Sequence, residues 1–167
     1  MTTQLTKTTL NPRVVIIAGS KSDEAFFEKI ATAVRSFGIE AITRVASAHK
    51  TPEYALMLLK DYEAEGRSTV YITVAGRSNA LSGFVDGAVL APVIACPPPS
   101  EALGGMDIIS SLRMPSGIAP AVVLDPENAA LLAAKILALS DNTLREQIEM
   151  YQHTAQTRII SADCNAT

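Results

Sequence analysis

The sequence predicts a three-layer α/β/α sandwich around a parallel sheet of about five strands. Short runs rich in Val and Ile recur along the 167 residues, and segments with apolar residues at helical spacing separate them. Glycine- or proline-containing segments mark the boundaries between these two kinds of run. Because strands that alternate with helices form parallel sheets through right-handed crossovers, we expect a single flavodoxin- or Rossmann-like domain.

Five short segments have the composition of strands. The runs "RVVIIA" and "TVYITVA" are apolar almost throughout, which is typical of strands that helices cover on both faces. In chain order, the expected strands are 13–18, 39–46, 69–75, 92–96 and 121–124.

The segments between these strands have helical patterns with recognisable ends. Gly38 and Gly66 follow two of them directly, as C-terminal caps do. Asp125 suits the N-cap of the clearest helix, and Pro126 suits its first turn. The expected helices are 24–37, 53–65, a short segment after 83, 107–113, 125–140 and 141–160.

Charge and cysteine content narrow the possible partners. The net charge is −3, from 14 basic and 17 acidic residues, which argues against nucleic acid because a phosphate backbone requires a basic surface. Cys96 and Cys164 lie far apart, so neither a disulfide framework nor zinc-ligand spacing is indicated. No apolar run reaches the ~18–20 residues that span a bilayer, so no membrane partner is expected.

The two ends of the chain differ from its centre. The first ten residues lack the apolar stretch of a signal peptide, and the low cysteine content suits the reducing cytoplasm. We therefore expect a cytoplasmic protein with a flexible N-terminus (1–12), one domain that includes the last helix (13–160) and a tail (161–167).

Polar loops follow the first three expected strands, at 19–23, 47–52 and 76–83. The carboxyl ends of parallel strands meet at one edge of a sheet, where ligands of such folds bind. The three loops are therefore expected to converge there and to form a site.

The first loop, "GSKSD", combines a turn-forming Gly19 with hydroxyl groups just before a helix. Such a helix start can bind phosphate, and the Asp23 carboxylate can accept hydrogen bonds from ribose hydroxyls. The alternative is a plain turn in which Ser22 or Asp23 caps the helix.

The second loop, "SAHKTP", contains one of the two histidines. An imidazole accepts and donates protons near neutral pH, so His49 is a candidate general base. Lys50 beside it can hold a phosphate as a point charge. The alternative is a loop histidine that bonds a backbone carbonyl, with Lys50 in solvent. His153, on the last helix, is expected to be a surface residue.

The third loop, "GRSNALSG", mixes glycines with a cation, a hydroxyl and an amide. It can present N–H donors to a carboxylate or to CO₂. The alternative is a polar loop whose Arg77 pairs with a surface acid.

The rigid segment "ACPPPS" is expected to form one wall of a pocket, with Cys96 as a buried thiol. Arg113 offers a further cation.

Six motifs together resemble the PurE enzymes of purine biosynthesis, over about 13–140. They are "GSKSD", "SAHKTP", "AGRSNALSGFVDG", "CPPPS", "SSLRMPSG" and "NAALLAAKIL". The class I enzymes of this family are mutases with a Gly/Ala-rich third loop that ends in a second histidine. This chain has Arg77, Ser78 and Asn79 there, with Ala80 at the position of that histidine. It also has Lys50 where class I usually has arginine, and both differences resemble class II.

The resemblance implies a 5-aminoimidazole ribonucleotide (AIR) carboxylase, which converts AIR and CO₂ reversibly into 4-carboxy-AIR without ATP, biotin, metal or other cofactor. It implies that His49 is the catalytic base. The other implied site residues, which bind the ribonucleotide or shelter CO₂, are Ser20, Asp23, Ser47, Lys50, Gly76, Arg77, Ser78 and Asn79. The alternatives are an N-carboxy-AIR mutase and a non-catalytic nucleotide-binding domain.

The resemblance also implies a homo-oligomer, a tetramer or an octamer. The last expected helix carries four apolar positions that suit contact with another subunit: Leu144, Ile148, Tyr151 and Ala155.

Overall fold

The protein is described by a computed structural model that covers residues 11–164. The expectations for the first ten residues and for 165–167 lie outside this range. Within it, no helix combines the length and the hydropathy that a bilayer-spanning segment requires.

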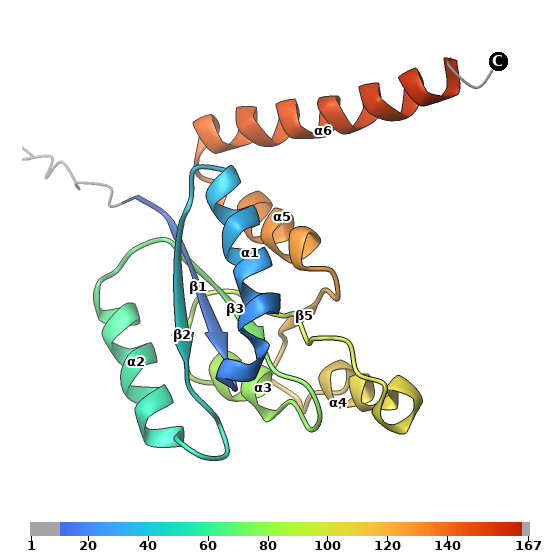
Figure 1. Ribbon diagram of the computed structural model, residues 1–167. Helices are drawn as coiled ribbons and strands as arrows, with labels where there is room; N and C mark the ends of the chain where they lie inside the picture. The colour runs from blue at the N-terminus through green and yellow to red at the C-terminus, as the bar shows by residue number, and fades with distance from the viewer. Residues whose placement is uncertain (1–10, 165–167) are drawn as a thin grey trace, which may run out of the picture.

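Five parallel strands form one sheet in the order β2-β1-β3-β4-β5 (Figure 1). This order confirms the flavodoxin-like fold expected from the sequence. The strands are β1 (Arg13–Ala18), β2 (Glu40–Val45), β3 (Thr69–Val74), β4 (Val93–Ala95) and β5 (Ala121–Val122).

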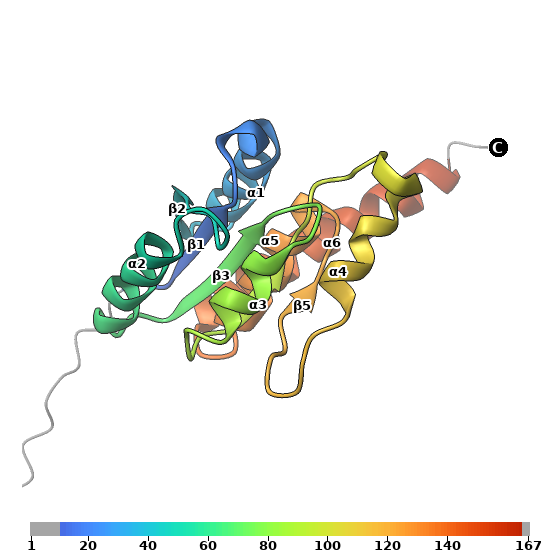
Figure 2. The same ribbon diagram turned by 90° about the horizontal axis from the view of Figure 1, so that it is seen from below.

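Helices cover both faces of this sheet. The main ones are α1 (Glu24–Ser36), α2 (Pro52–Ala64), α3 (Ala80–Asp86), α5 (Pro126–Leu137) and α6 (Asn142–Cys164). Figure 2 shows α1 and α5 on one side of the sheet and α2 and α3 on the other. Strand β1 is buried along its whole length, because alternate side chains enter the two resulting cores. Val14 and Ile16 pack in the α1/α5 layer, and Val15 and Ile17 pack in the α2/α3 layer.

The segment expected as a short helix over 107–113 is helical over 107–112, where the 3₁₀ segment η2 (Ala102–Ile108) leads into the short helix α4 (Ile109–Leu112). Just before it, Leu103 and the two glycines after it have positive φ angles of 52°, 63° and 79°, which exclude a continuous α-helix through these residues. Figure 1 shows η2 and α4 protruding from the body at the lower right.

Other boundaries also move. β5 ends at Val122 rather than at 124, because the last residue of its partner strand, Ala95, pairs with Val122. The helix expected over 125–140 runs from Pro126 to Leu137, and Asp125 caps it by accepting a hydrogen bond from the Asn128 N–H at 2.8 Å.

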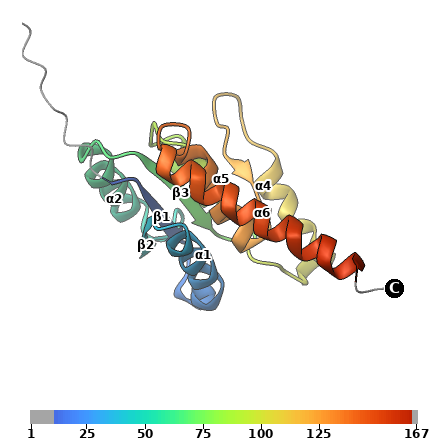
Figure 3. The ribbon, with the colours of Figure 1, turned by 90° about the horizontal axis from the view of Figure 1, so that it is seen from above.

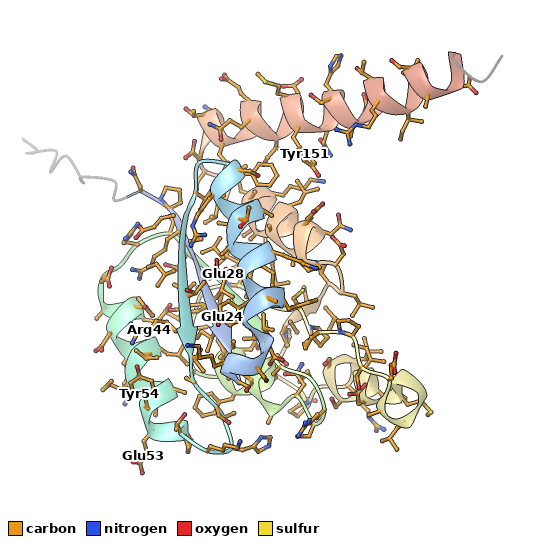
Figure 4. All side chains as sticks on the ribbon, viewed as in Figure 1. Glu24, Glu28, Arg44, Glu53, Tyr54 and Tyr151 are labelled. Carbon is orange, nitrogen blue, oxygen red and sulfur yellow. The ribbon has the colours of Figure 1, made fainter. Side chains whose placement is uncertain are left out.

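Helix α6 continues to Cys164, beyond the expected end at 160, and lies mostly outside the body. Leu144 and Ile148 are buried, and the Tyr151 ring packs edge-on against Phe37 with 5.3 Å between ring centroids (Figure 4). Residues 152–163 are exposed, His153 among them as expected. Figure 3 shows α6 lying across α5 and then extending away from it.

Arg13 anchors the amino end of the sheet. Its guanidinium donates to the Tyr62 carbonyl oxygen at 2.7 Å, to the Thr69 hydroxyl at 3.1 Å and to the Glu65 carboxylate. It also lies 4.8 Å from the centre of the Tyr62 ring. The side chain is only 1% exposed, so these contacts replace its hydration.

Candidate active site

The loops that follow β1, β2 and β3 lie at one edge of the sheet, as predicted. The Gly19 N–H donates to the Val74 carbonyl oxygen and the Ala46 N–H to that of Ala18, both at 2.9 Å, so the three strand ends are in register. The chain passes from β1 to β2 on one side and returns to β3 on the other. Ligands of such sheets bind at this point of reversal, between the ends of β1 and β3.

The first loop forms the 3₁₀ turn η1 (Lys21–Asp23). The Ser20 hydroxyl oxygen accepts a hydrogen bond from the Ser22 N–H at 3.2 Å and lies 2.8 Å from the Ser22 hydroxyl. Asp23 occupies the N-cap position of α1, but its side chain makes no capping hydrogen bond. Of the alternative reading, a turn with a capped helix, the turn and the N-cap position of Asp23 are therefore confirmed, but the side-chain capping bond is not. The Asp23 carboxylate stays half-buried at the edge of the site.

The second loop is held by two side chains of its own. The Ser47 hydroxyl oxygen accepts from the Lys50 N–H at 3.2 Å, and the Thr51 hydroxyl oxygen accepts from the Ser47 N–H at 2.9 Å. This turn exposes His49 and Lys50 to solvent. Thr51 was missed in the sequence, where it has no signal beyond its place before Pro52.

The start of α2, which follows this turn, is tied to the sheet. The Arg44 guanidinium on β2 donates to the Tyr54 hydroxyl on α2 at 2.9 Å (Figure 4). This hydrogen bond is the largest of the contributions that raise the pKa of Arg44. It fixes the start of α2, directly after the second loop.

The third loop is strained, but not at its glycine. Arg77 has φ 58° and Asn79 has φ 21°, whereas Gly76 does not adopt a positive φ. Bulky residues occupy this region rarely, and such residues cluster at functional sites. Asn79 also caps α3, since its Oδ1 accepts from the Ser82 N–H at 3.4 Å.

A cavity of about 480 Å³ opens beside the third loop. Gly76 and Arg77 line one side, and Pro97, Pro98, Pro99 and Ser100 line another, which confirms the expected proline wall. Asp107 also lines it, and within the described residues its Oδ2 is buried without a hydrogen-bond partner.

The predicted site residues divide between this cavity and the open sheet edge. Gly76 and Arg77 line the cavity. The other predicted site residues do not line the cavity: Ser20, Asp23, Ser47, His49, Lys50, Ser78 and Asn79. Strands in a sheet are ~4.8 Å apart, so the ends of β2 and β3, with β1 between them, are separated by roughly 10 Å, about the length of a ribonucleotide.

Cys96 and Arg113 do not line this cavity. Cys96 is buried and free, and its Sγ–H donates to the Leu124 carbonyl oxygen at 3.8 Å. Burial, with a smaller contribution from the Asp125 charge, raises the pKa of this thiol to about 12, as befits a structural cysteine. Arg113 is exposed at the end of α4. Across 11–164, no three His, Cys, Asp or Glu side chains are grouped closely enough to hold a metal ion.

Comparison with known proteins decides the family. The model of the family described as AIR carboxylase matches residues 13–158. The chain belongs to the AIR carboxylase family. This confirms the resemblance drawn from the motifs, and with it an enzyme family of purine biosynthesis.

Several members of the AIR carboxylase family are similar over most of the chain. The phosphoribosylaminoimidazole carboxylase of Treponema denticola is 54% identical over 92% of this chain and 97% of its own length. The protein of the same name from Archaeoglobus fulgidus is 55% identical, over 90% of this chain and 83% of its own length. The crystal structure of Treponema denticola PurE superposes with a TM-score of 0.92 and covers 93% of this chain and 98% of its own.

Proposed function

We propose that this family member carboxylates AIR directly with CO₂ to give 4-carboxy-AIR, reversibly, in de novo purine (IMP) biosynthesis. The observation that carries the proposal is the placement of the two histidines. His49 stands on a loop at the carboxyl edge, whereas His153 lies on α6, which Figure 1 shows at the opposite end of the molecule. A single imidazole per chain is thus available at this edge.

The chemistry needs no more than one base. AIR is an enamine, so an electron pair of its ring forms the bond to the CO₂ carbon. The ring carbon then bears both a hydrogen and the new carboxylate, and loss of that proton restores the aromatic ring. His49 accepts the proton, and in the reverse direction it returns it. The reaction written in this way requires neither ATP nor biotin.

The other residues bind and orient. Ser20 and Asp23 at the start of α1, with Ser47 and Lys50, hold the phosphate and ribose through hydroxyl, carboxylate and ammonium groups. Gly76, Arg77, Ser78 and Asn79 form the side of the site that receives CO₂, where the Arg77 cation stabilises the growing carboxylate. The enzyme acts in the cytoplasm on a small ribonucleotide.

The carboxylase and the mutase differ in the source of the carboxyl carbon. Purified protein with AIR and ¹³C-bicarbonate, without ATP, is expected to form 4-carboxy-AIR that carries the label. With N-carboxy-AIR labelled in its carboxyl group and excess unlabelled bicarbonate, the label is expected to be diluted in the product. A mutase would retain that label and would leave AIR and bicarbonate unchanged, and a binding domain would form no product in either mixture.

We further propose that the enzyme is a homo-oligomer, a tetramer or an octamer. The support is apolar surface around η2 and α4, where large side chains are exposed: Leu103, Met106, Ile109, Leu112 and Leu124. Exposed apolar side chains gathered in one part of the fold are typical of protein interfaces. Met150, Ile159 and Ile160 on α6 are exposed as well.

Sedimentation is expected to give four or eight times the 17.7 kDa chain mass. Leu112→Arg is expected to dissociate the assembly, because it places a charge in the apolar contact. Leu90→Arg, at a fully exposed leucine between α3 and β4, is the matched control and should leave the mass unchanged. A monomeric wild-type protein at micromolar concentration would refute the proposal.

A further inference from the structure

The strained third loop is held from outside by two consecutive serines of α4. The Asn79 side-chain Nδ2 donates to the Ser111 hydroxyl oxygen at 2.6 Å. The Ser110 hydroxyl oxygen lies 2.8 Å from the Arg77 carbonyl oxygen and 2.8 Å from that of Asp107. The two residues with left-handed backbone in this loop, Arg77 and Asn79, are thus the two that α4 contacts through hydrogen bonds.

The Asn79–Ser111 hydrogen bond is shielded from water, whereas Ser110 is half-buried and its contact with Arg77 is exposed. Asn79 is 4% exposed and Ser111 is 2% exposed, so neither amide nor hydroxyl can exchange its partner for solvent without opening the loop. Asn79 uses both ends of its amide, with Nδ2 directed to Ser111 and Oδ1 accepting from the Ser82 N–H. Loss of the Ser111 hydroxyl would leave a buried donor unpaired and loosen the cap of α3 at the same time.

We propose that Ser110 and Ser111 are positioning residues that keep the third loop in its active conformation. The inference rests on the proposed function in that this loop receives CO₂. A left-handed arginine and asparagine relax to ordinary φ angles unless neighbouring groups hold them. The serines supply that restraint, one at the Arg77 backbone and one at the Asn79 side chain. Ser111 also lines the cavity, but the role proposed for both serines is to hold the loop.

Ser111→Ala and Ser110→Ala test the restraint. Each is expected to lower kcat roughly 10- to 100-fold, the effect of moving a reacting group by about 1 Å. The KM for AIR should change little, because the first two loops hold the nucleotide. Ser110→Thr keeps the hydroxyl at a half-buried position and should restore kcat. Ser36→Ala is the matched control, since its hydroxyl also donates to a backbone carbonyl, that of Ala33 at 2.7 Å, on α1.

A second readout is independent of turnover. The Asn79 N–H donates to the Gly76 carbonyl oxygen at 3.2 Å, and the Ser82 N–H donates to Asn79 Oδ1. Hydrogen exchange at these two amides is expected to be faster in Ser111→Ala than in the wild type or in Ser36→Ala. Unchanged exchange together with unchanged kcat would overturn the inference. If the wild type fails to carboxylate AIR, the proposed function fails, and the exchange rates alone still decide whether the serines restrain the loop.

Discussion

His49→Asn is expected to lower the turnover of AIR by a factor of ~10²–10⁴, the usual contribution of a positioned acid or base. Asparagine is close to imidazole in size and keeps hydrogen-bonding atoms, but it cannot accept a proton at neutral pH. The second loop should keep its shape, because its turn is closed by Ser47 and Thr51 and not by the histidine. Steady-state formation of 4-carboxy-AIR measures kcat, and calorimetry with AIR measures whether the nucleotide still binds.

The chain provides its own control for this experiment. His153→Asn removes the other imidazole from an exposed position on α6 and should leave kcat unchanged. His49→Asn with wild-type turnover would remove His49 from the mechanism. Loss of turnover together with loss of AIR binding would assign it a binding role instead.

Arg13→Ala is expected to lower the free energy of unfolding by about 3 kcal/mol. Removing one partner of a buried ion pair costs ~3–5 kcal/mol, and the lower end applies because Glu65 is 45% exposed and regains hydration. The Tyr62 carbonyl and the Thr69 hydroxyl also lose a donor, and the void beside the Tyr62 ring removes packing. Urea unfolding followed by circular dichroism measures the change.

Arg35→Ala is the matched control for this loss. Arg35 lies on the surface of α1 and pairs with Glu28 at 3.6 Å, with both side chains about half exposed, so less than ~1 kcal/mol is expected. Because Arg13 lies at the amino end of the sheet, the kcat of the folded Arg13→Ala protein should match that of the wild type. Equal unfolding free energies for the two variants would show that the buried cluster contributes no more than a surface pair.

The architecture was predictable because its signals are local. The run 14–18 is apolar on both faces, and Gly38 and Gly66 have the positive φ that ends a helix. Parallel topology brings successive strand ends to one edge of the sheet. The position of the first three loops at that edge could therefore be predicted without knowing any side-chain contact. The motifs then indicated the family that the comparisons show.

Contacts between distant segments were not predictable. The Asn79–Ser111 hydrogen bond joins residues 32 positions apart, so no spacing rule reveals it. From the sequence, the glycines of the third loop were expected to provide its backbone flexibility. In the structure, the residues with left-handed backbone are Arg77 and Asn79, and groups on α4 hold them.

Helix α4 has two unlike sides. Ser110 and Ser111 hold the third loop, while Ile109 and Leu112 are open to solvent in the single chain. If the chain assembles through this face as proposed, a subunit that dissociates on strong dilution should still bind the nucleotide through the first two loops. The third loop, for which we propose the CO₂-receiving role, would be held less firmly, so kcat would fall before the affinity for the nucleotide does.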